Sequence, residues 1–250
     1  ARDATKPRLA SRSGPFALVV HLAQCLGGLP LGEQSILEIG DARATMALLE
    51  PYLNPPPLVV VISGPSGVGK DALVKRMKET GYPFSFVITA TDRPPRPGEV
   101  DGRDYCFYST VEFERMIAEG EMLEHSVVYG QHKGIPRAHV CRALEAGLDV
   151  IMRLDVQGAR KVKGILPVAI TVFLLPESEE ELQSRLLDRR SESEEALQRR
   201  RETLQEELAC IPEFDYVVMN RDNLLDEAVE DVKAILRAEH CRTEPRKVCL

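Results

Sequence analysis

The sequence of 250 residues lacks the features that mark several classes of protein. Basic residues are not in excess: 32 Lys and Arg face 39 Asp and Glu, and the net charge of −7 argues against bulk nucleic-acid binding. The six cysteines include no CxxC pair, which favours free thiols in a reducing compartment over disulfides or a zinc site. No apolar run approaches the roughly 20 residues that span a bilayer. There are no internal repeats, and the five histidines show no metal-ligand spacing. We therefore expect a soluble intracellular protein.

The most informative segment that is present is a glycine loop, Gly64-Pro65-Ser66-Gly67-Val68-Gly69-Lys70. It follows the apolar run 58–62 and leads into a segment that we expect to be helical. A strand, a glycine loop ending in lysine and then a helix form the context of a phosphate site. Backbone N–H groups and the helix N-terminus attract phosphate oxygens, and Lys70 reaches the outer phosphates. We therefore predict a bound nucleoside triphosphate; a glycine-rich turn without a ligand is the alternative.

The residue after Lys70 departs from this pattern. Ser or Thr normally stands there and ligates Mg²⁺ through its hydroxyl, whereas this chain has Asp71. A carboxylate also holds Mg²⁺, but it adds negative charge beside the phosphates. Asp71 is therefore our candidate metal ligand, directly or through a water molecule.

Apolar runs and helix-capping signals alternate along the chain. We expect strands at residues 58–62, 86–90, 148–154, 168–175 and 215–219. We expect helices after Asp71, from the capping box at 109–112 to Gly120, from Pro136 to Gly147, after a second capping box at 178–181, and at 224–238. This alternation predicts an α/β fold with a parallel sheet and helices on both faces. Ligands then gather at the carboxyl ends of the strands, where the glycine loop lies.

Residues 1–57 are predicted to be an extension outside a core domain at residues 58–250. Positions 34–53 have the apolar spacing of one or two short helices, and prolines 55–57 separate them from the first strand. The chain begins with Ala, so we expect a fragment or a processed form. Residues 1–14 are rich in Arg and poor in acid, which resembles part of an organellar transit peptide. A disordered tail is the alternative.

Four further segments carry a resemblance to a known family: RPPRPGEVDGRDY at 93–105, GEMLEH at 120–125, DVQGA at 155–159 and DYVVMN at 215–220. Together with the glycine loop, and in this order over about residues 58–240, they resemble the guanylate kinases, most of all the organellar enzymes of plants and algae. The resemblance implies a P-loop NTPase fold with a GMP-binding insertion at about 89–135 and a helical lid at about 178–210. It implies transfer of the γ-phosphoryl group of ATP to GMP with Mg²⁺, in a chloroplast or mitochondrion, with the cytoplasm as the alternative.

The resemblance also implies residue roles. Matching positions bind GMP at Thr89, Arg93, Arg96, Tyr105, Glu124, Lys133 and Asp155. Matching positions bind ATP at Gly64, Pro65, Ser66, Gly67, Val68, Gly69, Lys70, Asp71, Arg185 and Asn220. Lys70, Arg189 and Arg200 are the implied catalytic residues, because cations that close on the transferred phosphoryl group stabilise its transition-state charge. One carboxylate, Glu124, can accept both the N1–H and the N2–H of guanine, whereas adenine presents an acceptor at N1.

Two departures from the family pattern raise alternatives. The chain has Lys133-Gly134-Ile135 where the family has Tyr-Gly-Ser/Thr, and Arg153 where the family has an aspartate. We expect Arg153 and Asp71 to form a compensating charge pair. A guanylate-kinase-like scaffold domain that has lost catalysis and a kinase for another phosphorylated acceptor are the alternatives. We expect a monomer that binds GMP and ATP, without nucleic-acid or membrane partners.

Overall fold

The computed structural model of the chain describes residues 35–128, 130–178 and 203–250. The chain divides into two units, residues 1–49 and residues 50–250, with the border inside the helix α2 (Ser35–Leu53). Positions 34–53 are thus helical, as predicted, but they form one helix of 19 residues rather than short helices. In the described ranges no helix combines the length and the apolar character that a membrane crossing requires.

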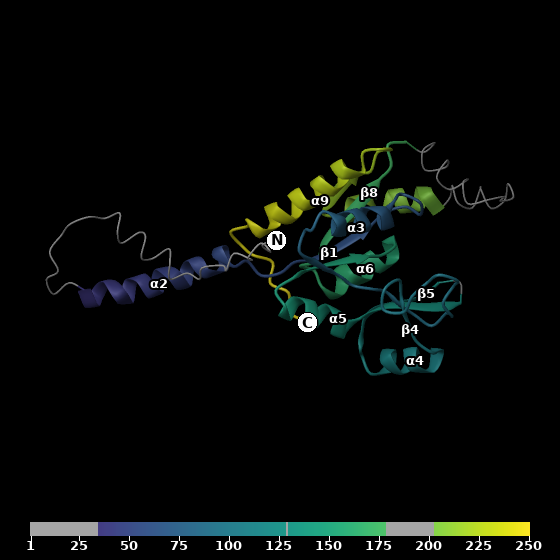
Figure 1. The fold of residues 1–250 in the computed structure, drawn as a ribbon, viewed down its shortest axis with the longest axis horizontal. Helices are drawn as coiled ribbons and strands as arrows, with labels where there is room; N and C mark the ends of the chain where they lie inside the picture. The colour runs from purple at the N-terminus through teal and green to yellow at the C-terminus, as the bar shows by residue number, and fades with distance from the viewer. Residues whose placement is uncertain (1–34, 129, 179–202) are drawn as a thin grey trace, which may run out of the picture. The chain divides into compact units, whose positions relative to one another are not determined.

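A five-stranded parallel sheet forms the centre of the second unit (Figure 1). Its order is β2-β7-β1-β8-β9, and every pair of neighbours is parallel. The strands are β1 (Val59–Ser63), β2 (Phe84–Phe86), β7 (Asp149–Arg153), β8 (Ile170–Leu175) and β9 (Tyr216–Met219). The predicted α/β fold with a parallel sheet is confirmed.

Helices cover both faces of the sheet, as Figure 1 shows. Successive side chains of a strand point to opposite faces. In β1, Val60 and Ile62 therefore pack with α3 (Lys70–Glu79) and α9 (Leu225–His240). Val59 and Val61 pack on the other side with α5 (Arg137–Glu145) and α6 (Val156–Ile165). This burial on both faces explains why β1 reads as an unbroken apolar run.

A second sheet, of four strands in the order β4-β3-β6-β5, extends from the first. Its strands are β3 (Ala90–Thr91), β4 (Cys106–Phe107), β5 (Met122–Val128) and β6 (Gln131–Pro136). The helix α4 (Thr110–Ala118) packs against it through Phe113 and Met116. As its capping box predicted, the Ser109 hydroxyl accepts a hydrogen bond from the Glu112 N–H at 3.2 Å. This sheet occupies the segment in which the GMP-binding insertion was predicted.

The prediction of one strand at 86–90 is wrong. The run is divided between the two sheets: β2 ends at Phe86 and β3 begins at Ala90. The Val87 N–H still bonds the Ile151 carbonyl of the first sheet, whereas the Thr89 carbonyl accepts from Cys106 in the second. Aromatic and β-branched residues fill positions 86–89 and favour a strand in either sheet, so the pattern gave no sign of the division. The hairpin of β5 and β6 was not predicted either.

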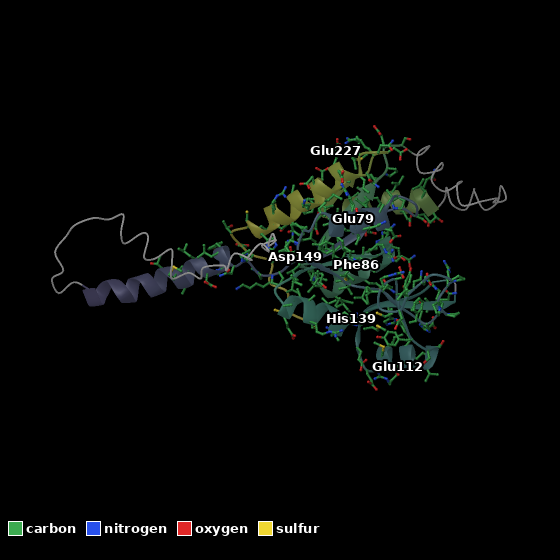
Figure 2. All side chains as sticks on the ribbon, viewed as in Figure 1. Glu79, Phe86, Glu112, His139, Asp149 and Glu227 are labelled. Carbon is green, nitrogen blue, oxygen red and sulfur yellow. The ribbon has the colours of Figure 1, made fainter. Side chains whose placement is uncertain are left out.

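Asp149, labelled in Figure 2, ties several elements together at the amino-terminal end of β7. Its carboxylate accepts from the Leu58 N–H at 2.9 Å and from the Tyr82 hydroxyl at 3.3 Å, and it lies 3.0 Å from His240 Nε2. The side chain is buried. The start of β1, the end of α9 and the segment before β2 therefore meet on one carboxylate.

The thiols in the described ranges are all free. Cys106 and Cys210 are buried, Cys141 is partly buried, and Cys241 and Cys249 are exposed near the C-terminus. Free thiols at these five positions agree with the sequence prediction.

Candidate functional site

The glycine loop connects β1 to α3, as predicted. Gly64, Gly67 and Gly69 have φ angles of 133°, 85° and 97°, a region that other residues rarely enter. A Cβ atom on Gly64 would lie 2.4 Å from the Leu174 carbonyl oxygen, so the loop leaves β1 where only glycine fits. Gly69 is the N-cap of α3 and offers no side chain there. The N-terminus of α3 is therefore open to an anion.

Lys70 begins α3 and turns back over the loop. Its ammonium donates hydrogen bonds to the carbonyl oxygens of Gly64 at 2.5 Å and Pro65 at 2.9 Å. Burial lowers the pKa of Lys70 to about 8, an effect that Glu207 opposes and Arg153 reinforces. The cation is thus held at the mouth of the loop before any ligand arrives.

Glu207, from the helical residues 203–209, lies beside this loop and was not predicted from the sequence. Its carboxylate accepts a hydrogen bond from the Ser66 N–H and faces Lys70, although burial raises its pKa. The Ser66 N–H, one of the loop donors that could bind a phosphate, is therefore bonded to Glu207 in this structure.

Asn220 stands just after β9 and is buried. Its side-chain amide donates to the Val68 carbonyl oxygen at 2.6 Å. The residue predicted near ATP therefore holds the glycine loop against the end of β9.

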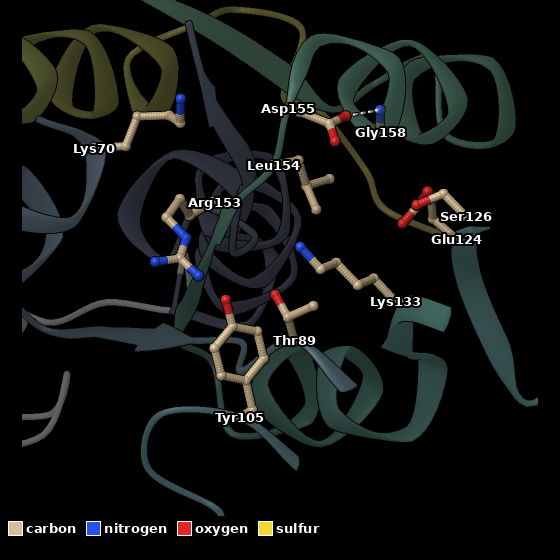
Figure 3. Close-up of a pocket in the computed structure, with 11 residues that line it drawn as sticks. Lys70, Thr89, Tyr105, Glu124, Ser126, Lys133, Arg153, Leu154, Asp155 and Gly158 are labelled. Atoms are coloured by element: carbon tan, nitrogen blue, oxygen red, sulfur yellow. Dashed lines mark hydrogen bonds between the residues drawn. The ribbon is translucent and has the colours of Figure 1, made fainter. Parts of the chain in front are cut away.

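A pocket opens beside Lys70, between the two sheets (Figure 3). Five of the seven predicted GMP ligands line it: Thr89, Tyr105, Glu124, Lys133 and Asp155. Ser126, Gly134, Arg153, Leu154 and Gly158 complete the lining. Figure 3 shows the polar ends of Arg153, Tyr105, Thr89 and Lys133 directed toward one another, with Glu124 and Asp155 on another side. The pocket therefore has a cationic part at Arg153 and Lys133 and an acidic part at Glu124 and Asp155, and Asp155 also raises the pKa of Lys70.

Glu124, on β5, is the most deeply buried acid of the pocket, with 4 % of its surface exposed. Its Oε1 atom is buried and has no hydrogen-bond partner. Burial raises the pKa of Glu124 to about 7; the ammonium of Lys161, 3.8 Å from Oε1, lowers it, and Asp155 raises it further. Asp155 itself caps α6 by accepting from the Gly158 N–H at 2.8 Å. A buried acceptor without a partner predicts a donor from a ligand.

The two predicted phosphate-binding arginines do not line this pocket. Arg93 is buried, and Glu99 holds its guanidinium through two hydrogen bonds of 2.6 Å. The same guanidinium lies 4.8 Å from the centre of the Tyr105 ring and supports that side chain. Arg96 is exposed, and its backbone N–H bonds Glu99 at 2.8 Å. Their direct contact with a phosphate stays a prediction.

Arg153 and Asp71 form an ion pair. Arg153 ends β7 and is largely buried, whereas Asp71 lies in the first turn of α3 and is mostly exposed. The predicted contact between the two departures from the family pattern is confirmed. In the described part of the chain no three His, Cys, Asp or Glu side chains gather as metal ligands. The predicted lid arginines Arg185, Arg189 and Arg200 lie outside the described residues.

Comparisons with known proteins agree on one family. The family model of guanylate kinase matches residues 57–239. A guanylate kinase 2 of rice, named chloroplastic/mitochondrial, is 45 % identical over 209 residues, which cover 83 % of this chain and 73 % of the relative. A guanylate kinase of the bacterium Caldanaerobacter subterraneus is 45 % identical over 76 % of this chain and 91 % of its own length. The crystal structure of guanylate kinase from Anaplasma phagocytophilum superposes with a TM-score of 0.60 and 28 % identity, covering 75 % of this chain and 88 % of that one.

Proposed function

Because the chain belongs to the guanylate kinase family, we propose that the pocket beside the glycine loop binds GMP and directs its phosphate at ATP held on that loop. The chain is an enzyme that transfers the γ-phosphoryl group of ATP to GMP, which gives ADP and GDP. The comparisons offer no support for the alternative of a scaffold domain without catalysis.

The observation that carries this assignment of the pocket is the buried Oε1 atom of Glu124, which makes no hydrogen bond. The ionised carboxylate has acceptors only, so it fits the two donors on the guanine edge. Adenine presents an acceptor at N1, and an unpaired polar contact in a buried site costs about 1–3 kcal/mol. Thr89 and Asp155 line the same pocket and supply further polar contacts to a base. The acidic part of the pocket therefore selects guanine.

The cationic part of the pocket suits the phosphate of GMP. Lys133, Arg153 and the Tyr105 hydroxyl surround a space that continues toward Lys70. In the reaction a phosphate oxygen of GMP attacks the γ-phosphorus of ATP, the bond to the bridging oxygen breaks, and ADP leaves. The protein contributes positioning and electrostatic stabilisation rather than a covalent intermediate. Lys70 neutralises charge on the transferred group, because its ammonium already lies at the loop.

We propose Asp71 as the protein side chain that would bind Mg²⁺. Mg²⁺ keeps several waters and takes one or two carboxylates besides nucleotide phosphates, so a full cluster of protein ligands is not needed. Asp71 is 77 % exposed beside the loop, while Arg153 balances its charge. When bound, Mg²⁺ neutralises phosphate charge. Asp71 orients its shell, directly or through water.

One assay tests the proposed function: release of ADP from ATP with GMP, dGMP, AMP, CMP or UMP as the acceptor. We expect turnover with GMP and dGMP and background rates with the others. Lys70→Ala serves as the inactive control on the same preparation. Equal turnover with AMP would contradict the role of Glu124, and no turnover with GMP would contradict the proposed function itself.

Two finer proposals concern location and assembly. A relative at 45 % identity is named chloroplastic/mitochondrial, and residues 1–14 are poor in acid, so we propose import into a plastid or mitochondrion. A fluorescent fusion to the C-terminus of the complete precursor tests this, and cytoplasmic fluorescence would contradict it. We further propose a monomer, which light scattering after size exclusion tests.

A further inference from the structure

We infer that Lys161 is a positioning residue for base selection: its ammonium keeps the Glu124 carboxylate ionised and oriented toward the guanine edge. This inference rests on the proposed function and deepens it. Lys161 does not line the pocket and belongs to none of the segments by which the chain resembles the family. It acts on the base only through Glu124.

The geometry fixes the ammonium in place. Lys161 extends from α6 toward β5, and its Nζ atom donates a hydrogen bond of 2.6 Å to the His125 carbonyl oxygen. The same Nζ atom lies 3.8 Å from Glu124 Oε1, the buried acceptor without a partner. At this distance the ammonium attracts the carboxylate without occupying the acceptor that guanine requires.

The other charged groups around Glu124 do not replace Lys161. Asp155, at the start of α6, raises the pKa of Glu124, and burial raises it more. Lys133 on β6 and Arg153 on β7 line the same pocket in its cationic part, and neither contributes to the shift in the Glu124 pKa. His125, the neighbour on β5, has its own pKa lowered by burial, so it is neutral near pH 7. Lys161 is therefore the one cation that lowers the Glu124 pKa among the described residues.

The charge of Glu124 matters because its ionised and protonated forms make hydrogen bonds to different bases. The ionised carboxylate accepts from both guanine donors, whereas the protonated acid has an O–H that donates and so fits an acceptor such as adenine N1. With the Glu124 pKa at about 7, the folded site loses its carboxylate as the pH falls through neutrality. An opposite charge within about 4–6 Å typically lowers a carboxyl pKa by about 1–3 units. Because Lys161 is half exposed, we take the low end.

The test is the pH profile of the KM for GMP between pH 6 and 9, for the wild type and Lys161→Met. KM should change with pH as Glu124 titrates. Loss of the ammonium should move the midpoint of this change upward by about one pH unit. At pH 7 the ionised fraction then falls from about one half to about one tenth, so KM rises about fivefold. At pH 9 the two profiles should converge. The ratio of kcat/KM for GMP over AMP should fall in Lys161→Met at pH 7.

Three variants make this result specific. Glu124→Gln removes the titrating group and leaves the ionisation of the GMP phosphate, so its profile is the baseline that is subtracted. Lys161→Arg keeps a cation and should keep the wild-type midpoint. Lys247→Met removes the same charge from an exposed position far along the chain, and it should leave the profile unchanged. Thermal unfolding of each variant confirms that the comparison is made on folded protein.

An unchanged midpoint in Lys161→Met would overturn the inference, as would a KM raised by the same factor at every pH. The latter result would mean that Lys161 only supports the fold or attracts the phosphate. A wild type that turns over no GMP at any pH would instead overturn the proposed function, which separates the two failures.

Discussion

Replacing Glu124 with glutamine tests base selection at a single group. The amide keeps one acceptor and introduces a donor, so one of the two guanine N–H groups faces another N–H. Each unpaired buried donor costs about 1–3 kcal/mol, and we expect the GMP/AMP ratio of kcat/KM to fall about 10- to 100-fold. Steady-state kinetics with both acceptors measures the ratio. A ratio equal to that of the wild type would remove Glu124 from the guanine site.

Replacing Lys70 with alanine tests the phosphate site. The ammonium bonds only carbonyl oxygens of its own loop, so its loss should leave the sheet and helices folded. Loss of a group that stabilises transition-state charge costs about 10²- to 10³-fold in kcat, and a full positive charge at a phosphoryl group should cost at least that much. Single-turnover rates and circular dichroism measure the two effects. An unfolded variant, or one with near-normal turnover, would count against this role.

At the scale of elements, the ion pair of Asp71 and Arg153 joins α3 to β7 at the phosphate end of the sheet. Because each charge offsets the other, Asp71→Ser and Arg153→Asp should each lower kcat/KM, and the double variant should recover much of the loss. Interacting residues show coupling of roughly 0.5–3 kcal/mol, whereas independent ones add within about 0.5. A double-mutant cycle measures the coupling. Simple additivity would show that the two side chains touch without acting together.

Local signals predicted the elements well where a strand lies within one sheet or where one residue caps a helix. The runs at β1, β7, β8 and β9 and the caps at Ser109 and Gly147 are local patterns, and the structure confirms them. The change of sheet between Phe86 and Ala90 was missed, because the aromatic and β-branched residues of this run favour a strand in either sheet.

In the candidate site too, residues within local motifs were predicted, and residues brought in by tertiary packing were not. Residues within motifs, such as Glu124 and Lys133, were found from their neighbours in sequence. Lys161 and Glu207 were missed because only the packing of α6 and of residues 203–209 brings them to the site. The ion pair of Arg93 with Glu99 was also missed. The sequence of this charged turn does not show whether Glu99 will pair with Arg93 or with Arg96.

At the scale of the whole molecule, replacing Asp149 tests how much its hydrogen bonds at one end of the first sheet contribute to stability. Asp149→Ala leaves the Leu58 N–H and the Tyr82 hydroxyl without their acceptor in a buried place. We expect a loss of about 2–4 kcal/mol in the free energy of unfolding, with kcat unchanged while the protein is folded, because Asp149 lies at the opposite end of β7 from Arg153. Urea unfolding measures the loss. Asp231→Ala, on the exposed side of α9, is the control, and an equal loss there would contradict the prediction.

The division into two units predicts that residues 1–49 can be removed without loss of activity. A chain that begins at residue 50 retains both sheets and the whole pocket. We expect its kcat/KM for GMP to stay within about twofold of the full chain, as for a domain with its own core. A larger loss on folded protein would give residues 1–49 a part in catalysis.

The two buried thiols, Cys106 and Cys210, can report local opening of the unmodified protein. A thiol reagent should label Cys241 and Cys249 at once, but it reaches Cys106 only when the core of the second sheet opens. Cys210 packs against Phe173 of the first sheet and reports separately on that region. The labelling rate of each buried thiol, followed by mass spectrometry with and without GMP, therefore gives the opening frequency of each sheet without altering a residue.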